Sequence, residues 1–316
     1  MGLPPADPAI SADMQRWKYW SAHPLTAGSR SHVLADEATV VAHGARWPIR
    51  LRTAAGEFEA LHLIDWAARR DSGGSGMQIM RSCTQDAAAV FSIGGSAMTR
   101  KLVPVFGFRP QNAMVFLERP LQPLQPAWND SPRDWKLPAR LLRNLFCRLR
   151  PVGALSREWS SAPAGPDQIP ERLFPRPSGD GAASMRTAAL LNHVLACPAF
   201  TSSRCCLLYR SGEPTAYFVL AESQRTVRLL DYGPAELSEE TAGAMARAAL
   251  RLASREFRNA HSIRVGATEP GVVTAFAGAG YRVSRPTPIN VLKRAPELRA
   301  VKSFRLTLLD WDAACL

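Results

Sequence analysis

The sequence predicts an α/β (α+β) fold made of two units in tandem, and three observations support this. The chain has 316 residues, about the length of two ordinary domains. Strand-like and helical patterns alternate in two segments of the chain. Between them lies a stretch rich in proline, glycine and serine, which disfavours helices and strands. We therefore expect domains at 1–125 and 183–316, joined by a connector at 126–182.

The first domain is predicted to begin as a meander of strands and to continue with alternating helices and strands. Its strands are short apolar runs, several with period-two spacing. Ser96 suits the N-cap of the later helix, because its hydroxyl can accept an amide hydrogen bond. The expected elements are two strands within Ser31–Arg52, a strand at Glu57–Ala67, a helix beginning at Gly73–Met80, a strand at Ala89–Ile93, a helix at Ser96–Phe106 and a strand at Met114–Leu117.

The connector contains one helix candidate, Trp135–Arg150. Leucines recur there at helical spacing, and arginines occupy the other face. We expect this helix to dock on a domain with its arginines in solvent. A contact with an acidic surface or a membrane is the alternative.

The second domain repeats the element order of the first. Ser238, followed by Glu239 and Glu240, suits the N-terminus of a long helix, where acidic side chains are favoured. The expected elements are strands at Cys205–Tyr209, Tyr217–Glu222 and Val227–Tyr232, a helix at Ser238–Phe257, a strand at Ser262–Ala267, a helix at Val272–Ala279 and a strand at Ile289–Leu292.

Two short matches indicate that the two domains arose by duplication. Leu63-Ile64-Asp65-Trp66 ends a strand of the first domain, and Leu229-Leu230-Asp231-Tyr232 ends the corresponding strand of the second. Gly107-Phe108-Arg109 and Gly280-Tyr281-Arg282 then follow the later helices in the same order. Because Asp65 and Asp231 recur, we expect them to hold the strand ends rather than to react.

The composition excludes several classes of protein. With 46% apolar and 21% charged residues, the chain is typical of globular rather than disordered proteins. It has no apolar run of 18 residues, so no membrane span is expected. Met1–Met14 lacks the basic and apolar regions of a secretory signal, which favours a cytoplasmic location. The six cysteines form no CxxC pair and have no zinc-ligand spacing, so no metal is predicted.

The net charge of +12 comes mainly from arginine. Such an excess can indicate a polyanionic partner. The arginines are spread along the whole chain, however, and no nucleic-acid recognition motif accompanies them. Nucleic-acid binding is therefore not expected, except by tRNA under an alternative given below.

A glycine-rich turn after the third strand of the first domain carries the strongest chemical signal. Gly73-Gly74-Ser75-Gly76 stands before a predicted helix. Such a turn exposes several amide N–H groups at a helix N-terminus, which favours a phosphate or a pyrophosphate. The turn is not a P-loop, because no Lys-Ser/Thr pair follows its last glycine.

Together, the meander, the strand ending in Leu63–Trp66, the Gly74-Ser75-Gly76 loop and Val105-Phe106-Gly107-Phe108-Arg109 resemble the GNAT (GCN5-related N-acetyltransferase) superfamily. The chain is similar in particular to bacterial tandem GNAT-like proteins. The resemblance implies a twisted mixed sheet whose two central strands splay apart. It also implies acetyl-CoA or another acyl-CoA as co-substrate, bound in that splay.

The resemblance also assigns roles to individual residues. Period-two alternation puts Ala60, His62, Ile64 and Trp66 on one face of a strand, and His62 is the candidate general base. The pantetheine would lie beside the backbone near Trp66, and the glycine turn would hold the pyrophosphate with a nearby arginine. The predicted cofactor-binding residues are Trp66, Ala67, Arg70, Gly73, Gly74, Ser75, Gly76 and Met77.

Several positions depart from the GNAT pattern. The tyrosine that serves as general acid in the family is replaced by Val103 in the first domain and by Phe276 in the second. Asp71 stands where the family prefers arginine or glutamine. No Gly-x-Gly follows Tyr232, which indicates that the second domain is a degenerate copy.

The sequence therefore predicts an acyltransferase that moves an acyl group, acetyl in the simplest case, from acyl-CoA to an amine or hydroxyl by direct transfer in the first domain. One alternative is a non-catalytic tandem module for binding or assembly. Another is a FemAB-like transferase that uses aminoacyl-tRNA, which the basic helix in the connector suggests. The acceptor, a small molecule, carries no recognisable code in this sequence.

Overall fold

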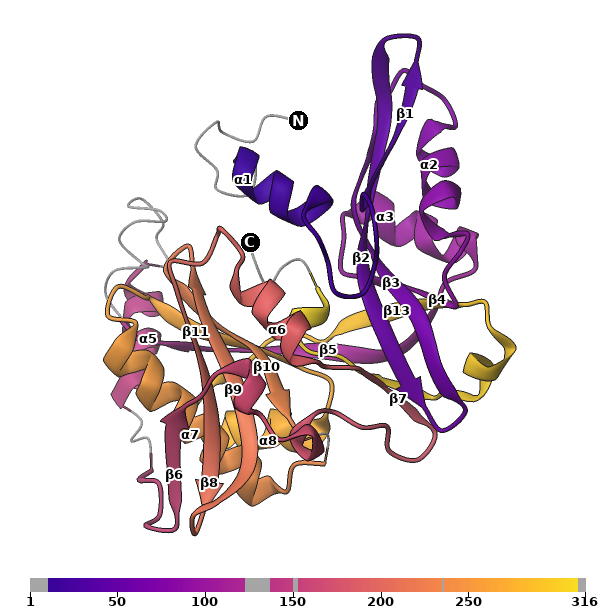
Figure 1. The fold of residues 1–316 in the computed structure, drawn as a ribbon. Helices are drawn as coiled ribbons and strands as arrows, with labels where there is room; N and C mark the ends of the chain where they lie inside the picture. The colour runs from indigo at the N-terminus through magenta and orange to yellow at the C-terminus, as the bar shows by residue number, and fades with distance from the viewer. Residues whose placement is uncertain (1–10, 123–136, 150–152, 235, 312–316) are drawn as a thin grey trace.

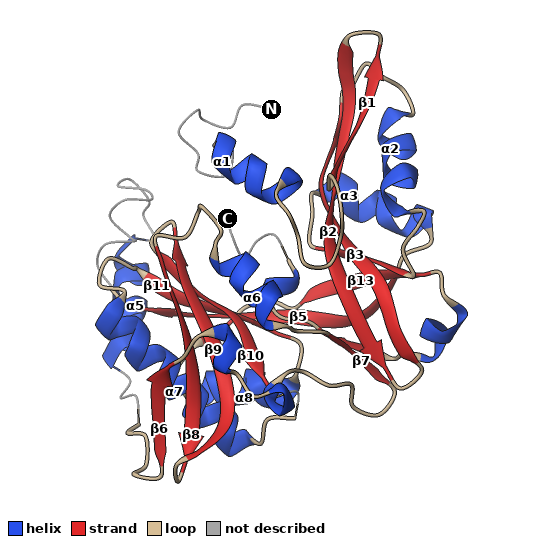
Figure 2. Cartoon of the chain, in the orientation of Figure 1, coloured by secondary structure: helices blue, strands red, loops and turns tan. Residues whose placement is uncertain are grey.

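The computed structural model describes residues 11–122, 137–149, 153–234 and 236–311. Its strands join into one sheet (Figure 2). They are β1 (Ser31–Asp36), β2 (Thr39–Thr53), β3 (Gly56–Ala68), β4 (Ala89–Ile93), β5 (Arg109–Pro120), β6 (Trp159–Pro163), β7 (Gly181–Ser184), β8 (Ser202–Arg210), β9 (Glu213–Ser223), β10 (Thr226–Gly233), β11 (Ser262–Ala267), β12 (Arg282–Val283), β13 (Thr287–Lys293) and β14 (Ser303–Arg305).

Helices cover this sheet on several sides (Figure 1). No helix in the described residues is both long and apolar enough to cross a membrane. The helices are α1 (Ala12–Gln15), which continues as a π-helix (Arg16–Trp20), α2 (Ser75–Thr84), α3 (Ala97–Leu102), which continues as a 3-10 helix (Val103–Phe106), α5 (Leu137–Leu149), α6 (Ala188–Leu195), α7 (Glu239–Glu256) and α8 (Pro270–Gly278), with single 3-10 turns at Pro166–Gln168, Glu171–Leu173, Pro296–Ala300 and Leu308–Asp310.

The predicted strands and helices are present, and the differences have physical causes. Ser96 caps α3 as predicted, its Oγ accepting from Thr99 N at 3.1 Å. The predicted helix at Ser96–Phe106 tightens into a 3-10 turn at Val103, because Pro104 has no N–H to give to an α-helical bond. Within the predicted connector, β6 forms in spite of its proline because it is the edge strand of the sheet.

The predicted connector helix is α5, which packs against β5. Its predicted first two residues, Trp135 and Lys136, and its last, Arg150, lie outside the described residues, as do the side chains of all its arginines. Leu142, Leu145 and Phe146 are exposed on it.

The strand order is β14-β7-β2-β3-β4-β13-β5-β11-β10-β9-β8-β6, with β1 on β2 and β12 on β5. The two domains thus exchange strands. Arg109–Met114 of β5 pairs with β13, and Val115–Pro120 pairs with β11. Since β13 lies between β4 and β5, the C-terminal part of the chain completes the first domain. Conversely, β5 lies between β11 and β12 and completes the second. The predicted domain boundaries remain a prediction.

The two faces of the sheet pack against different hydrophobic cores. Leu61 and Leu63 of β3 pack under α2, and Val227 and Leu229 of β10 pack under α7. The opposite face of both halves shares one large core, and we call this the inner face. The N-terminal helix, α6 and the C-terminal segment lie over it, between the two groups of strands (Figure 1).

The duplication is visible in the geometry. In each domain a pair of parallel strands, β3–β4 or β10–β11, is followed by a helix that ends in a left-handed glycine. These glycines are Gly107 (φ +87°) and Gly280 (φ +86°), the two predicted to correspond. The third strand of each repeat is bulged beside Asp65 or Asp231.

Two histidines, the buried His23 and the half-buried His193, lie where the N-terminal helix meets the second domain. The rings of His23 and His193 are 4.6 Å apart, and Trp17 stacks on His193. Arg30 donates from its guanidinium to the Trp17 and Lys18 carbonyls. Burial, reinforced by the positive charge of Arg30, lowers the pKa of His23 to about 3 and that of His193 to about 4.

We expect the protein to lose stability as the pH falls from about 6.5 towards 4. The unfolded chain binds protons on His23 and His193 near pH 6.5, whereas the folded protein does not, so acid favours unfolding. Thermal unfolding at several pH values in this range measures how steeply the stability falls with pH. The double variant His23→Gln/His193→Gln should flatten it, and an unchanged slope in that variant would contradict the assignment.

Candidate functional site

In the first domain, two parallel strands of the sheet separate, and we call the place where they part the opening. β3 pairs with β4 only from Ala60 to His62, opposite Ala89 to Phe91, and β3 then continues to Ala68. The N–H of Ile93 donates to His62 Nε2 at 3.3 Å, so a side chain replaces the backbone partner at the point of divergence. This opening lies at the carboxyl end of β4, the end where α/β sheets bind ligands.

A β-bulge shapes the wall of the opening. Asp65 and Trp66 of β3 together oppose Gly44 of β2, and Asp65 has a left-handed backbone (φ +49°), which aspartate tolerates. Gly44 is needed because a Cβ there would lie 2.9 Å from Cys83 Sγ on α2. The extra residue also breaks the alternation of side chains along β3.

The bulge therefore corrects one prediction. Ala60 and Ile64 lie in the inner-face core, and His62 contacts that side through the ring of Trp311, 6.2 Å between centroids. Trp66 lies instead on the α2 side. The prediction that all four side chains share one face is wrong at Trp66, because period-two alternation does not continue through a bulge.

Trp66 connects the walls of the opening. Its Nε1 donates to Gly76 O in the first turn of α2 at 2.8 Å, and its ring packs edge-on against Phe106, 6.3 Å between centroids. The same elements carry three apolar side chains in solvent: Met77, Met98 and Val105. An apolar ligand would gain contacts on this surface.

The glycine turn precedes α2, and some of its backbone N–H groups donate no hydrogen bond within the described residues. Ser75 N donates to Ser72 O, and Met77 N donates to Gly74 O. Within the described residues, the amides of Gly73, Gly74 and Gly76 donate no hydrogen bond. The predicted pyrophosphate residues thus divide into three glycines with available donors and two residues whose amides are already used.

The charges of this turn favour an anion. Arg69 binds Asp71 through two hydrogen bonds, Nε–Oδ1 at 3.0 Å and Nη2–Oδ2 at 2.6 Å. Hydrogen bonding from the Arg69 guanidinium lowers the pKa of Asp71, and the pair largely neutralises itself. Arg70 is exposed and has no ion pair among the described residues. The misplaced acid at Asp71 therefore leaves the turn with one uncompensated positive charge.

Asp65 and Asp231 hold the strand ends, as predicted. Asp65 accepts from Lys18 Nζ at 2.6 Å and from Tyr19 Oη at 2.7 Å, which fixes the N-terminal helix on β3. Asp231, fully buried, accepts from Arg186 Nε at 2.9 Å and from Tyr217 Oη at 2.6 Å. In both domains, the aspartate beside the bulge binds one cation and one tyrosine.

In the second domain, the corresponding opening is filled by the chain itself. β10 and β11 pair up to Leu229 and Val265, and residues 305–310 then occupy the space beyond. Arg305 Nη2 donates to the carbonyl of Tyr232, the residue that corresponds to Trp66, at 3.0 Å. Arg186 joins this segment to the strand by binding Asp310 as well as Asp231. These contacts confirm that the second copy is degenerate, and no sequence motif marked them.

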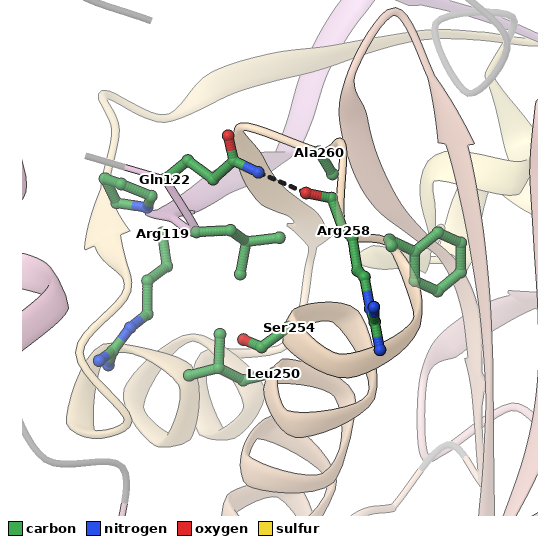
Figure 3. Close-up of a pocket in the computed structure, with 9 residues that line it drawn as sticks. Arg119, Gln122, Leu250, Ser254, Arg258 and Ala260 are labelled. Atoms are coloured by element: carbon green, nitrogen blue, oxygen red, sulfur yellow. Dashed lines mark hydrogen bonds between the residues drawn. The ribbon is translucent and has the colours of Figure 1, made fainter. Parts of the chain in front are cut away.

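The 380 Å³ cavity of Figure 3 lies at the other end of the second domain. It opens beside Leu121, whose N–H donates to His261 O just before β11 begins. That is the amino end of β11, opposite the divergence, so the cavity is not placed for a coenzyme held between splayed strands. The nine residues that line it are Arg119, Pro120, Leu121, Gln122, Leu250, Ser254, Phe257, Arg258 and Ala260.

Comparison with known proteins identifies the fold. No family model and no curated protein matches the sequence. Among solved structures, N-myristoyltransferase from Saccharomyces cerevisiae with bound myristoyl-CoA aligns with a TM-score of 0.56 at 11% identity, over 89% of this chain and 69% of that one. A tandem GNAT protein from the clavulanic acid biosynthesis pathway aligns with a TM-score of 0.51 at 9% identity, over 86% and 84% of the two chains.

A GCN5-related N-acetyltransferase from Anabaena variabilis aligns with a TM-score of 0.51 at 9% identity, over 84% of this chain. The chain spans 63% of the length of that protein. The splayed parallel strands, the bulge beside Asp65 and the second set of the same elements agree with these likenesses. The chain therefore has the GNAT fold, in a tandem arrangement whose second copy is degenerate.

Proposed function

We propose that this protein is an acyl-CoA-dependent acyltransferase that binds its coenzyme in the first domain. One observation carries the proposal. Of two corresponding openings, that of the first domain has a turn with free amides at Gly73, Gly74 and Gly76, whereas that of the second is filled by residues 305–310. The pyrophosphate would lie on the glycine turn beside Arg70, and the pantetheine would run along Trp66 and Ala67 towards His62.

The chemistry asks little of the protein beyond positioning. The acceptor nitrogen or oxygen attacks the thioester carbonyl, the C–S bond breaks, and coenzyme A leaves as a thiolate. The nucleophile gives up one proton and the thiolate takes one. Beyond His62, the edge of β3 that faces away from β2 is no longer paired with β4, so a backbone N–H on this edge can polarise the carbonyl. Since Val103 replaces the tyrosine of the family, water would protonate the thiolate.

His62 is proposed as the base that receives the proton of the nucleophile. It lies at the point where the strands part and is 2% exposed, so the reaction would occur away from bulk water. Its Nε2 accepts a hydrogen bond from Ile93 N in this structure. The imidazole must therefore release that bond before Nε2 can take a proton.

A non-catalytic tandem module is the second candidate. The apolar Val103 and the engaged Nε2 of His62 favour it. In that case the first domain would bind acyl-CoA and transfer nothing. The tRNA-dependent alternative gains no support, since it depends on arginine side chains of α5 that lie outside the described residues.

Coenzyme binding is tested by a charge placed on the turn. Gly73 is exposed, and a Cβ there would meet nothing within 4 Å, so the site accepts a side chain. Gly73→Glu should weaken acetyl-CoA binding at least about tenfold by repelling the pyrophosphate, as measured by calorimetry. Gly73→Gln, of equal size, is the matched control and should bind close to the wild type.

Equal losses in both Gly73 variants would indicate steric blocking rather than repulsion. The proposal of coenzyme binding fails if the unaltered protein binds neither acetyl-CoA nor longer acyl-CoA at millimolar concentration.

The role of His62 is tested by His62→Gln. Glutamine can accept the Ile93 N–H through Oε1, so the strand contact is preserved. We expect release of free thiol from acyl-CoA, in the presence of a panel of amines, to fall about 10²–10⁴-fold, while acyl-CoA affinity stays within about twofold. A variant as active as the wild type would remove His62 from the mechanism, and inactivity of both proteins across the panel would favour the non-catalytic module.

A further inference from the structure

A separate cavity of about 330 Å³ lies on the inner face, beside the opening of the first domain. Its volume is at the lower end of the range for small-molecule sites. One wall is apolar and consists of Phe116, Leu308 and Trp311. Trp311 connects the cavity to the opening: its ring is 6.2 Å from that of His62, and a Cβ on Gly94 would lie 3.6 Å from it. One side chain thus separates this cavity from the place where the strands part.

The other wall of the cavity is a row of charges across four neighbouring strands. Arg228 of β10 is directly opposite Arg264 of β11, Arg264 is opposite Glu118 of β5, and Glu118 is opposite Arg282 of β12. Directly opposed residues share one face of a sheet, and all four line the cavity. The row therefore presents three guanidinium groups and one carboxylate.

Glu118 balances this row only in part. Its Oε2 is 3.7 Å from Nη2 of Arg264 and 3.7 Å from Nη2 of Arg282, and both distances exceed those of hydrogen bonds. Arg264 and Arg282 are about half exposed at the mouth, with side-chain exposures of 44% and 49%. Their planar groups suit a carboxylate or a phosphate, which can accept two parallel hydrogen bonds from each.

A simple solvated row of charges accounts less well for this wall. Arg228 is only 4% exposed, and its Nη1 donates to Ser223 O at 2.9 Å. Arg264, directly opposite it on β11, has a side-chain exposure of 44%, so the row runs from a buried arginine to exposed ones.

We propose that this cavity binds the acceptor of acyl transfer, and that the acceptor is a small molecule with an apolar body and a carboxylate or phosphate group. The inference rests on the proposed function, which supplies the acyl donor. Phe116, Leu308 and Trp311 hold the apolar body, and Arg264 and Arg282 hold the anion. The nucleophilic end points past Trp311 to the thioester near His62.

Binding of matched probes tests the proposal. The acids are phenylacetate and phenyl phosphate. Phenylacetamide is the neutral counterpart of phenylacetate with nearly the same shape, and benzyl alcohol is a smaller neutral control. Ligand-observed NMR with the full chain, at up to about 10 mM probe, should show binding of the acids and not of the neutral compounds. Arg264→Gln/Arg282→Gln should weaken the acids at least about tenfold.

Glu118→Gln gives a readout of opposite sign. Removing the carboxylate that competes for both arginines should strengthen acid binding about threefold or more. A merely structural role of the row would not produce this gain, and the variant keeps the assignment testable if the double arginine variant does not fold.

The two proposals can fail separately. Gly73→Glu should leave the acid probes unaffected, and Arg264→Gln/Arg282→Gln should leave acetyl-CoA affinity unchanged. Equal binding of acids and amides, no binding of either acid, or weaker binding in Glu118→Gln would overturn the acceptor site. One further result would overturn it: acetyl-CoA competes with phenylacetate, and Arg264→Gln/Arg282→Gln lowers the affinity for acetyl-CoA. In that case the cavity would hold a coenzyme phosphate rather than an acceptor.

Discussion

The exchange of β5 and β13 between the two halves is the constraint on which the rest of the structure depends. Strand β5 has different partners along its length: it pairs with β13 over Arg109–Met114 and with β11 over Val115–Pro120. Each half therefore lacks a strand of its own and is completed by the other. This continuity brings the inner faces of both halves into one core, and it places the C-terminal segment beside both pairs of parallel strands.

The two copies share the same local structure but differ in what surrounds it. Both have a bulge on the third strand and an aspartate that holds a cation and a tyrosine. In the second copy the cation is Arg186, buried between Asp231 and Asp310, and its removal would leave two carboxylates without a counter-ion in the interior. In that copy the C-terminal segment fills the space beyond the parallel strands, while the first copy keeps free amides at its glycine turn. The two copies therefore differ in what occupies the same position of the fold.

Local signals in the sequence predicted most elements, because strand alternation, N-caps and glycine turns act over a few residues. The Ser96 and Ser238 caps and the bounds of β4 and β11 illustrate this. The partners of β13 could not be predicted, because the strand pairs with residues of β4 about 200 positions earlier in the chain. The bulge was also missed, and with it the position of Trp66: alternation describes a regular strand, and nothing in Asp65–Trp66 itself reports the opposing Gly44.

At the site, the same limit applies. The glycine turn was found because its amides belong to consecutive residues, whereas the row of Arg228, Arg264, Glu118 and Arg282 is assembled from four separate strands.

The exchanged strand has a further consequence during synthesis. A ribosome produces β4 and β5 long before β13, so two strand edges of the first half stay unpaired until β13 has been synthesised. Such edges favour association with other nascent chains, and chaperones would protect the protein until β13 emerges.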